Sequence, residues 1–366
     1  MRHGEVRWSV ERSNQNGGEL VALRDHRCLI SDQFTLTAAR PPGRVDWRVN
    51  TPAGLATAEL PDGRIARVED GELVFRDPGT GETVASIGAG RVSSLTVAPG
   101  GLLAYGRRSP DSGGELVVST PDGQELWSVP LTAPDRTPVV ITDAIVVVDG
   151  AVLRAYDLGG RPLWSAGRHG FRAGRALADP GTDEIVGPVL ALNEGPLVFE
   201  VRWVDGSALL AVDPRAATVD RIVPPVGLHG PRVPVELAGH TPGLVTLGPS
   251  SESTAEPGRH TWRVVAVDLA GRLRWSHELS AQPRALLPAG AGHTVVVCSP
   301  TLEQWRSYHR WYDLSDQCAV RVLDAGGDAA WGWDAPGPLT ARPAVGPDGT
   351  VYVAGPDRLW AIADAP

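Results

Sequence analysis

One segment of this sequence concentrates the residue types that do chemistry. Residues 298–318, CSPTLEQWRSYHRWYDLSDQC, hold two of the five tyrosines, two of the 12 tryptophans and a histidine. Its aromatic, guanidinium, imidazole and carboxylate groups are those of Trp305, Arg306, Tyr308, His309, Arg310, Trp311, Tyr312 and Asp313. We interpret this set as a binding site for a ligand or a partner, in which His309 and Tyr308 are also candidate catalytic acid and base groups.

Other interpretations of the segment stay open. So much aromatic surface in a loop is unfavourable unless something covers it, and the rings can instead fold back as a small core of the loop itself. A metal site at His309 with Tyr308 or Asp313 is disfavoured, because a single histidine lacks partners at metal-site spacing. We therefore predict no metal.

Two further segments, GRHGFRAGR at 167–175 and LHGPR at 228–232, are rich in basic side chains. They include Arg168, His169, Arg172, His229 and Arg232. If both are loops at one end of the fold, they form a positive funnel suited to a carboxylate or phosphate group. His169 is then a second candidate acid or base. The alternative is that both are solvated surface loops.

The composition excludes several kinds of chemistry. All 34 basic residues are arginine, which fits a GC-rich genome and removes the lysine that Schiff-base, pyridoxal and P-loop sites require. The net charge is -9, whereas a nucleic-acid-binding face is usually basic, so we expect no nucleic-acid partner. The polar N-terminus and the lack of a long apolar span predict a cytoplasmic protein without a membrane contact, and we expect a monomer.

Short strands are the elements that must position these residues. The chain holds 43 glycines and 32 prolines, and no stretch sustains a 3.6-residue apolar period, which predicts an all-β protein. One unit recurs at 145–165, 261–279 and 317–334. It consists of a strand, an aspartate, a turn with glycine, and a second strand with a tryptophan.

The repeat has a clear physical logic in residues 145–165. Asp157 can accept hydrogen bonds from the turn amides, and the glycines supply the positive φ angles that the turn needs. Trp164 then projects from the outer strand against the neighbouring sheet. Six tryptophans take this position: Trp8, Trp47, Trp127, Trp164, Trp275 and Trp331. A degenerate copy at 71–87 has Val84 in place of tryptophan.

Counting outer strands gives eight units. They fall near residues 8, 47, 84, 127, 164, 219, 275 and 331, or about 46 residues each, which is the length of a four-stranded propeller blade. The chain ends with three strands of a blade, and its first segment can supply the fourth. We predict a single domain over 1–366, an eight-bladed β-propeller of four-stranded antiparallel blades, closed by a last blade made of about 338–366 plus 4–12.

The repeat resembles that of the PQQ-type propellers, the eight-bladed family of the quinoprotein alcohol dehydrogenases. Its alanine-x-aspartate, glycine turn and docking tryptophan match well at Ala155, Asp157, Gly160 and Trp164. The resemblance implies the fold of that family over the whole chain. It does not imply that family's activity, because fold alone does not determine function.

The quinone-site residues of that family are missing here. Quinoprotein dehydrogenases have an adjacent cysteine pair and a calcium site of Glu, Asn and Asp, whereas Cys28, Cys298 and Cys318 are all separate and only four asparagines occur. We therefore expect no cofactor. Cys298 ends one predicted strand and Cys318 starts the next, so the two can face each other at a separation compatible with a disulfide. In a reducing cytoplasm we favour free thiols, and we interpret Cys28 as a buried strand residue.

In a propeller, the loops between the second and third strands and those joining the blades emerge at one end, around the channel mouth. Three loops of the first kind are long, at 106–114, 248–260 and 298–318. We predict a binding module that recognises a small molecule or a protein at this mouth. The alternative is a cofactor-independent enzyme of the cyclase or lyase type, with a histidine acid or base in the central funnel.

Overall fold

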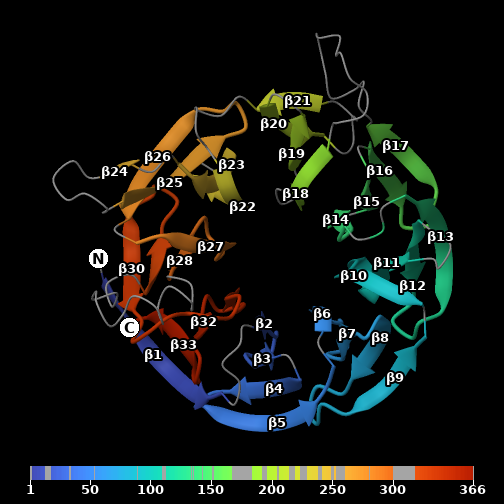
Figure 1. Cartoon of the computed structure of the whole chain (residues 1–366), viewed down its shortest axis with the longest axis horizontal. Coiled ribbons are helices and arrows are strands. Elements are labelled where there is room, and N and C mark those ends of the chain that lie inside the picture. Colours follow the sequence, from blue (N-terminus) through green and yellow to red (C-terminus); the bar gives the residue numbers. More distant parts are fainter. Residues whose placement is uncertain are drawn as a thin grey trace. The chain divides into compact units, whose positions relative to one another are not determined.

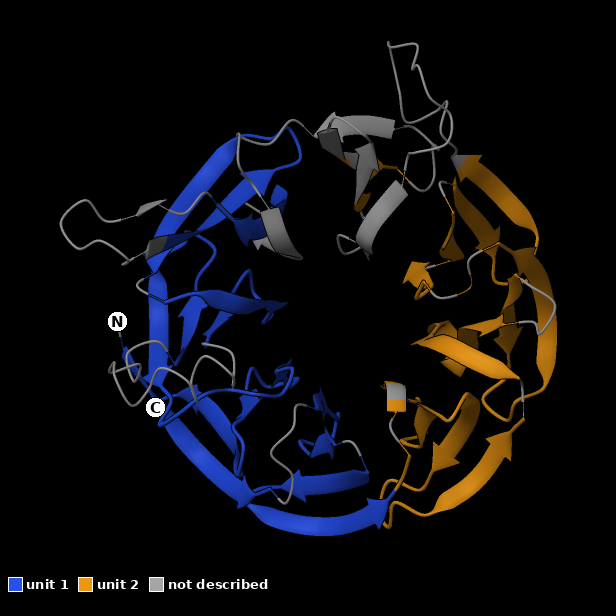
Figure 2. Cartoon of the chain, in the orientation of Figure 1, with its two compact units in different colours: residues 1–50, 224–366 blue, residues 51–223 orange. Residues whose placement is uncertain are grey.

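The computed structural model of the chain is built from β-strands. The residues that it describes are 2–12, 18–32, 34–52, 54–88, 90–108, 113–132, 134, 136–141, 143–150, 152–166, 184–191, 196–203, 206–213, 219–222, 229–237, 241–248, 251–252, 260–279, 281–299 and 318–365. Within these ranges the only helical element is a 3₁₀ turn at Pro99–Gly101. The chain divides into two compact units, unit 1 (residues 1–50 and 224–366) and unit 2 (residues 51–223), which Figure 2 shows in blue and orange.

Unit 2 contains four antiparallel sheets of four strands each, which we call blades 2 to 5 (Figure 1). In every blade the strands pair in chain order. Their bounds are β6 (Gly54–Glu59), β7 (Ile65–Glu69), β8 (Glu72–Arg76) and β9 (Thr83–Ile87); β10 (Arg91–Val97), β11 (Leu103–Arg108), β12 (Gly114–Ser119) and β13 (Glu125–Leu131); β14 (Val139–Ile141), β15 (Ala144–Asp149), β16 (Val152–Asp157) and β17 (Pro162–Ala166); β18 (Glu184–Ala191), β19 (Leu197–Trp203), β20 (Gly206–Val212) and β21 (Val219–Ile222).

Unit 1 contains four further blades, numbered 1, 6, 7 and 8. A short extra strand, β24 (Ser251–Glu252), pairs with β25 of blade 6. The blades are β2 (Glu19–Ala22), β3 (Cys28–Ser31), β4 (Thr35–Arg40) and β5 (Arg44–Asn50); β22 (His229–Leu237), β23 (Thr241–Leu247), β25 (His260–Asp268) and β26 (Leu273–Leu279); β27 (Pro283–Pro288), β28 (Thr294–Cys298), β29 (Ala319–Leu323) and β30 (Ala329–Asp334); β31 (Ala344–Val345), β32 (Val351–Ala354), β33 (Arg358–Asp364) and β1 (Arg2–Glu11). The prediction of eight four-stranded blades is confirmed, and each predicted outer strand is the fourth strand of its blade.

The N-terminal strand completes the last blade, as the sequence predicts. β1 pairs antiparallel with β33 from Gly4 to Glu11, so the first strand of the chain is the outer strand of blade 8. At its start, Arg2 and His3 also pair in parallel with β30 of blade 7. The N-terminal strand therefore joins two blades of unit 1 into one continuous sheet.

The six repeat tryptophans share one register position. Each lies opposite the residue at which the ladder shifts by a β-bulge, as Trp164 does opposite Ala155 and Trp275 opposite Ala266. Residues 71–87 follow the same pattern, but Ala85 rather than Val84 takes the tryptophan position, opposite Phe75. The prediction for Val84 was therefore wrong by one residue, because the turn before it is one residue longer. The Asp77 N–H donates to the carbonyl of Glu82, five residues on, whereas the Asp157 N–H donates to that of Arg161, four residues on.

The tryptophan of one blade docks on the glycine turn of the next. In unit 2 the Trp127 indole Nε1 donates to the carbonyl of Leu158 at 3.0 Å, and its ring covers Gly160. In unit 1 Trp275 donates to Ala325 at 3.1 Å over Gly327. The predicted wedging of these rings against a neighbouring sheet is confirmed at both places.

Aspartates hold these turns in shape. The Asp157 carboxylate accepts hydrogen bonds from the backbone N–H groups of Gly159 and Arg161, at 3.0 and 2.8 Å. The bond from the Arg161 amide is the largest of the effects that lower the pKa of Asp157. Asp324 accepts equivalent bonds from Gly326 and Asp328, so the same carboxylate turn recurs in both units.

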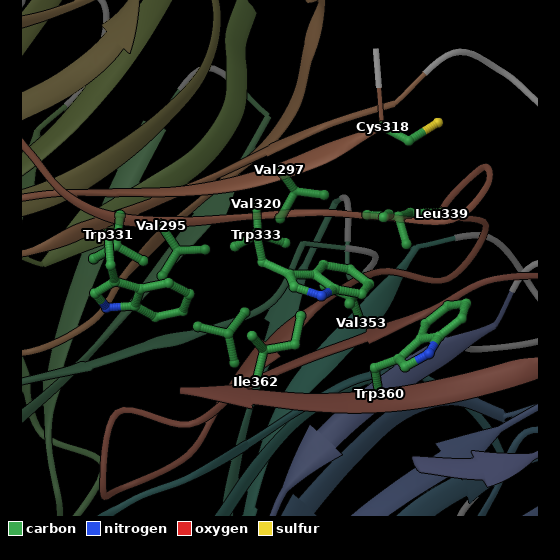
Figure 3. Packing of buried hydrophobic residues seen from close by; sticks show 13 residues of the cluster. Val295, Val297, Cys318, Val320, Trp331, Trp333, Leu339, Val353, Trp360 and Ile362 are labelled. Carbon is green, nitrogen blue, oxygen red and sulfur yellow. The ribbon is translucent and has the colours of Figure 1, made fainter. Parts of the chain in front are cut away.

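Hydrophobic side chains fill the space between neighbouring sheets. Figure 3 shows the core between blades 7 and 8, where valines of β28 and β29 meet Trp331, Trp333 and Trp360. Trp333 and Trp360 pack with their ring centroids 5.6 Å apart. Burial of such large rings is the main stabilising contribution of a tryptophan-rich repeat, since each covers a large apolar area.

Candidate functional site

The long connections lie where the sequence predicts them, between the second and third strands of a blade. They join β11 to β12, β23 to β25, and β28 to β29. The first is shorter than predicted, because β11 and β12 stay paired up to Arg108 and Gly114. In the second, β24 pairs with the start of β25 and extends that hairpin.

Most of the predicted site residues lie outside the described residues. These are Arg168, His169, Arg172, Trp305, Arg306, Tyr308, His309, Arg310, Trp311, Tyr312 and Asp313. Their roles in binding or in acid and base catalysis therefore stay predictions.

His229 and Arg232 were predicted in a loop between blades, and this prediction was wrong. Both lie in β22, the first strand of blade 6, where they pair with Leu247 and Thr246 across a bulge. The sequence HGPR favours a loop because glycine and proline usually end a strand. β22 is an edge strand with a bulge at this point, and a proline without an N–H group is tolerated there.

Cys298 and Cys318 do not face each other as predicted. The residue opposite Cys298 is Ala319, and successive side chains of a strand point to opposite faces. Cys298 accordingly packs in the core on one face of blade 7 and Cys318 in the core on the other. These two thiols and that of Cys28 are buried and are not joined in disulfides, as favoured from the sequence. Burial raises the pKa of Cys298 to about 12, so this thiol is neutral and unreactive at neutral pH.

A buried ion pair lies at the loop end of blade 1. Arg12, directly after β1, donates to Asp32, directly after β3, and their side chains are only 1% and 3% exposed. The same guanidinium donates to the carbonyl of Gly355 at 2.7 Å. Arg12 thus connects the end of blade 8 with the second strand of blade 1.

A second buried charge network lies at the same end of blade 2. Glu69, the last residue of β7, accepts hydrogen bonds from Arg67 at 3.1 Å and from two nitrogens of Arg76 at 2.9 and 2.7 Å. Arg67 also donates to Thr51 at 2.6 Å. A Cβ on Gly54 would lie 2.3 Å from the Arg67 guanidinium, so β6 can pass over this network only with glycine there.

Asp149 has the corresponding place in blade 4. It ends β15 and accepts hydrogen bonds from the backbone N–H and the hydroxyl of Thr132, which follows the outer strand of blade 3. Arg154 pairs with its second oxygen at 2.9 Å. Asp149 thus links blade 4 to the end of the outer strand β13 of blade 3.

These acids share a position that sequence reasoning missed. Asp32, Glu69 and Asp149 each end the second strand or follow it directly, and each is at most 5% exposed. The signal was present as a carboxylate directly after a buried run, as in CLISD and IVVVD. Because buried charges must be paired, we assign these groups a structural role in the fold.

The described ranges contain no group of three or more His, Cys, Asp or Glu side chains placed to hold a metal ion. No helix in the same ranges is long and apolar enough to cross a membrane.

Comparisons with known proteins agree with this architecture. Residues 69–220, from the end of β7 into β21, match the model of the family described as outer membrane protein assembly factor BamB. No curated protein matches the sequence.

Three solved structures share the fold at low sequence identity. BamB from Moraxella catarrhalis is 14% identical with a TM-score of 0.60, and the match covers 98% of this chain and 99% of that one. Dihydro-heme d1 dehydrogenase NirN, solved in complex with DHE, is 15% identical with a TM-score of 0.64, covering 98% and 76%. The Dos1 propeller is 8% identical with a TM-score of 0.61, covering 98% and 95%.

Identities this low establish the fold and leave activity open. The sheet order, the docking tryptophans and the matched structures together confirm the resemblance inferred from the repeat. The chain has the fold of the PQQ-type eight-bladed β-propellers, and its residues 69–220 match a family model of that group.

Proposed function

We propose that the protein is a binding module, which recognises a partner protein or a small molecule through the connections between second and third strands. One observation carries this proposal. Cys298 and Ala319 are directly paired, so a short turn would be enough to join β28 to β29, yet residues 299–318 are inserted there. Long insertions at the end of a rigid scaffold are where folded proteins usually place binding residues.

The surrounding scaffold supports the same role. The acids at the ends of β3, β7 and β15 are buried and paired, which fixes the bases from which the connections leave. The matched family model is that of an assembly factor, a kind of role performed by binding other proteins.

Shortening the insertion tests the proposal. In the variant, residues 300–317 are replaced by Asn-Gly, so that Ser299-Asn-Gly-Cys318 closes the hairpin. Ser299 is kept because its hydroxyl accepts a hydrogen bond from the backbone N–H of Leu339 at 3.0 Å. The natural chain and the variant are each used to capture proteins from a lysate of the source organism, and the captured proteins are quantified. We expect the variant to keep the circular dichroism spectrum of the natural chain but to lose the partner proteins that the natural chain captures.

The matched control is Leu126→Ser, which changes a side chain that is 48% exposed on the outer strand β13. It should capture the same proteins as the natural chain. Undiminished capture by the shortened variant would refute the role of this connection. The enzyme alternative stays a prediction, and any turnover found should then fall in a double variant of His309→Ala and His169→Ala.

A further inference from the structure

A groove lies on the outer strands of blades 8 and 1 in unit 1. Its volume is about 620 Å³. It is lined by the end of β1, by the start of β33, and by β5 with the turn before it; the residues are Ser9, Val10, Glu11, Arg12, Gly43, Val45, Arg48 and Arg358. Strands rather than long connections form its walls, so this groove is separate from the site proposed above.

An unusual turn borders the groove. At the two junctions described above an aspartate turn supports the docked tryptophan. Here β4 and β5 are joined by Arg40-Pro41-Pro42-Gly43, with a cis bond between the prolines. Gly43 has a φ of 100°, and a Cβ there would lie 2.7 Å from the Ser9 carbonyl oxygen. The turn therefore rests directly on the backbone of β1, and the groove opens beside this contact.

Two arginines of the groove have donors to spare. Arg48 donates from Nε to the Thr37 hydroxyl at 3.2 Å, and its terminal nitrogens have no partner among the described residues. Arg358 makes only long contacts, at 3.4 Å to the Ser9 hydroxyl and 4.0 Å to Glu11. Arg12 differs from both, because its buried guanidinium is committed to Asp32.

The rest of the lining is partly apolar. Val10 is buried, and Val45 is 38% exposed, which is high for a valine in a strand. The Glu11 side chain is 89% exposed and is free to turn away from the groove. The groove therefore presents two available guanidinium groups beside an aliphatic surface.

We propose that this groove binds an extended acidic segment of a partner polypeptide, whose carboxylates pair with Arg48 and Arg358 while aliphatic atoms cover Val45. A planar guanidinium matches a carboxylate in two parallel hydrogen bonds. The volume is far larger than one carboxylate and falls in the range of roughly 300–1,000 Å³ that holds ligands of several groups. The chain has a net charge of -9, so most of its surface repels an anionic ligand. A short acidic peptide segment would contact only the groove, whereas a long nucleic-acid backbone would also run across the negative surface around it.

The test uses a fluorescein-labelled octapeptide of alternating glutamate and serine, with its glutamine counterpart as a control. Fluorescence anisotropy in 50 mM NaCl, an ionic strength that screens charges only weakly, should detect binding of the glutamate peptide alone. Arg48→Gln and Arg358→Gln should each weaken binding at least about fivefold, and the double variant at least about twentyfold. Arg91→Gln, an exposed arginine on β10, is the matched control and should leave binding unchanged.

Several results would overturn the proposal. Equal binding of the glutamine peptide, or full binding by the double variant, would show that the two guanidinium groups do not recognise carboxylates. Binding of free glutamate or inorganic phosphate as tight as that of the octapeptide would indicate a small-anion site, and stronger binding of an eight-residue oligothymidylate would indicate nucleic acid. Absence of peptide binding would refute it outright. The shortened β28–β29 variant should still bind the peptide, so the two proposals can fail separately.

Discussion

At the scale of single residues, Gly160 and Gly327 of the aspartate turns each meet two structural requirements at once. Gly160 has a φ of 86°, a region that other residues enter only with strain. A Cβ at this position would also lie 2.7 Å from the ring of Trp127. The same two constraints apply to Gly327 and Trp275, so the tryptophan and the glycine of the repeat depend on each other across two blades.

Substitution in this turn should show that dependence. We expect Gly160→Ala to lower the free energy of unfolding by about 2–4 kcal/mol, from the positive φ together with the displaced ring. Gly159→Ala, in the same turn, should change it by less than about 1 kcal/mol, because its Cβ would meet only the Asp157 carboxylate at an ordinary 3.4 Å. Urea unfolding measures both. Equal losses in the two variants would contradict the docking argument.

The Cys298 thiol should make stability depend on alkaline pH. Its pKa rises from an ordinary 9.0 to about 12 on folding, chiefly because of burial. The folded state then holds its proton while the unfolded state loses it, so this contribution is complete below pH 9 and is lost as the pH rises toward 12. The free energy of unfolding should fall by up to about 1.4 kcal/mol per pH unit from this thiol.

The matched variant is Cys298→Val, which keeps an apolar side chain of similar size in the core. Its unfolding free energy, measured between pH 8 and 10.5 with a reductant present, should fall less steeply than that of the natural chain. Parallel slopes would show that the thiol is not buried as described.

At the scale of elements, β1 is the strand on which blade 8 depends. It pairs with β33 along its length, buries Trp8 to 6% exposure and leads into the Arg12 ion pair. A chain without residues 1–12 should therefore lose stability and expose the edge of β33. A synthetic peptide of residues 2–12 should bind it and raise its melting temperature, as a ligand of the folded state does.

The control peptide carries Trp8→Ala. Loss of a buried tryptophan costs about 3–5 kcal/mol, so this peptide should bind at least about a hundredfold more weakly. A truncated chain as stable as the natural one, or equal rescue by the two peptides, would contradict the role given to β1.

The elements could be predicted from the sequence where the repeat is intact. Aspartate, glycine and tryptophan at fixed spacing identified the outer strands, including the strand at Trp8 that returns to the last blade. The prediction failed at Val84, where the preceding turn is one residue longer than in the intact repeats. It also failed at His229 and Arg232, where a bulged edge strand accepts glycine and proline. Such details depend on pairing with a neighbouring strand, which a single segment of sequence does not contain.

For the candidate site, the sequence predicted the position of the long connection but not the buried acids beside it. The connection after Cys298 could be located as an insertion between two strands, because the repeat stops there and resumes at Cys318. The buried acid Glu69 was missed although its partners Arg67 and Arg76 lie close to it in the chain. Asp32 and Asp149 were missed because they pair with Arg12 and Thr132, which follow strands of other blades. Spacing along the chain carries no information on such long-range pairs.

At the scale of the whole molecule, the eight blades repeat one four-stranded unit, and they differ in the connections between their strands. The third-to-fourth strand turns of blades 4 and 7 are short and hold aspartate and tryptophan contacts. The second-to-third strand connections vary in length, and the longest lies in blade 7. A repeat fold that is constant at one end and variable at the other is expected to recognise its partners at the variable end.

Hydrogen–deuterium exchange of the protein with and without its captured partner tests this claim most directly. The account predicts that the partner slows exchange in residues 106–114, 248–260 and 298–318, with the largest effect in the last. The turns at 157–161 and 324–328 should exchange equally in both states. Protection confined to those turns, with none in the three connections, would contradict the proposed function.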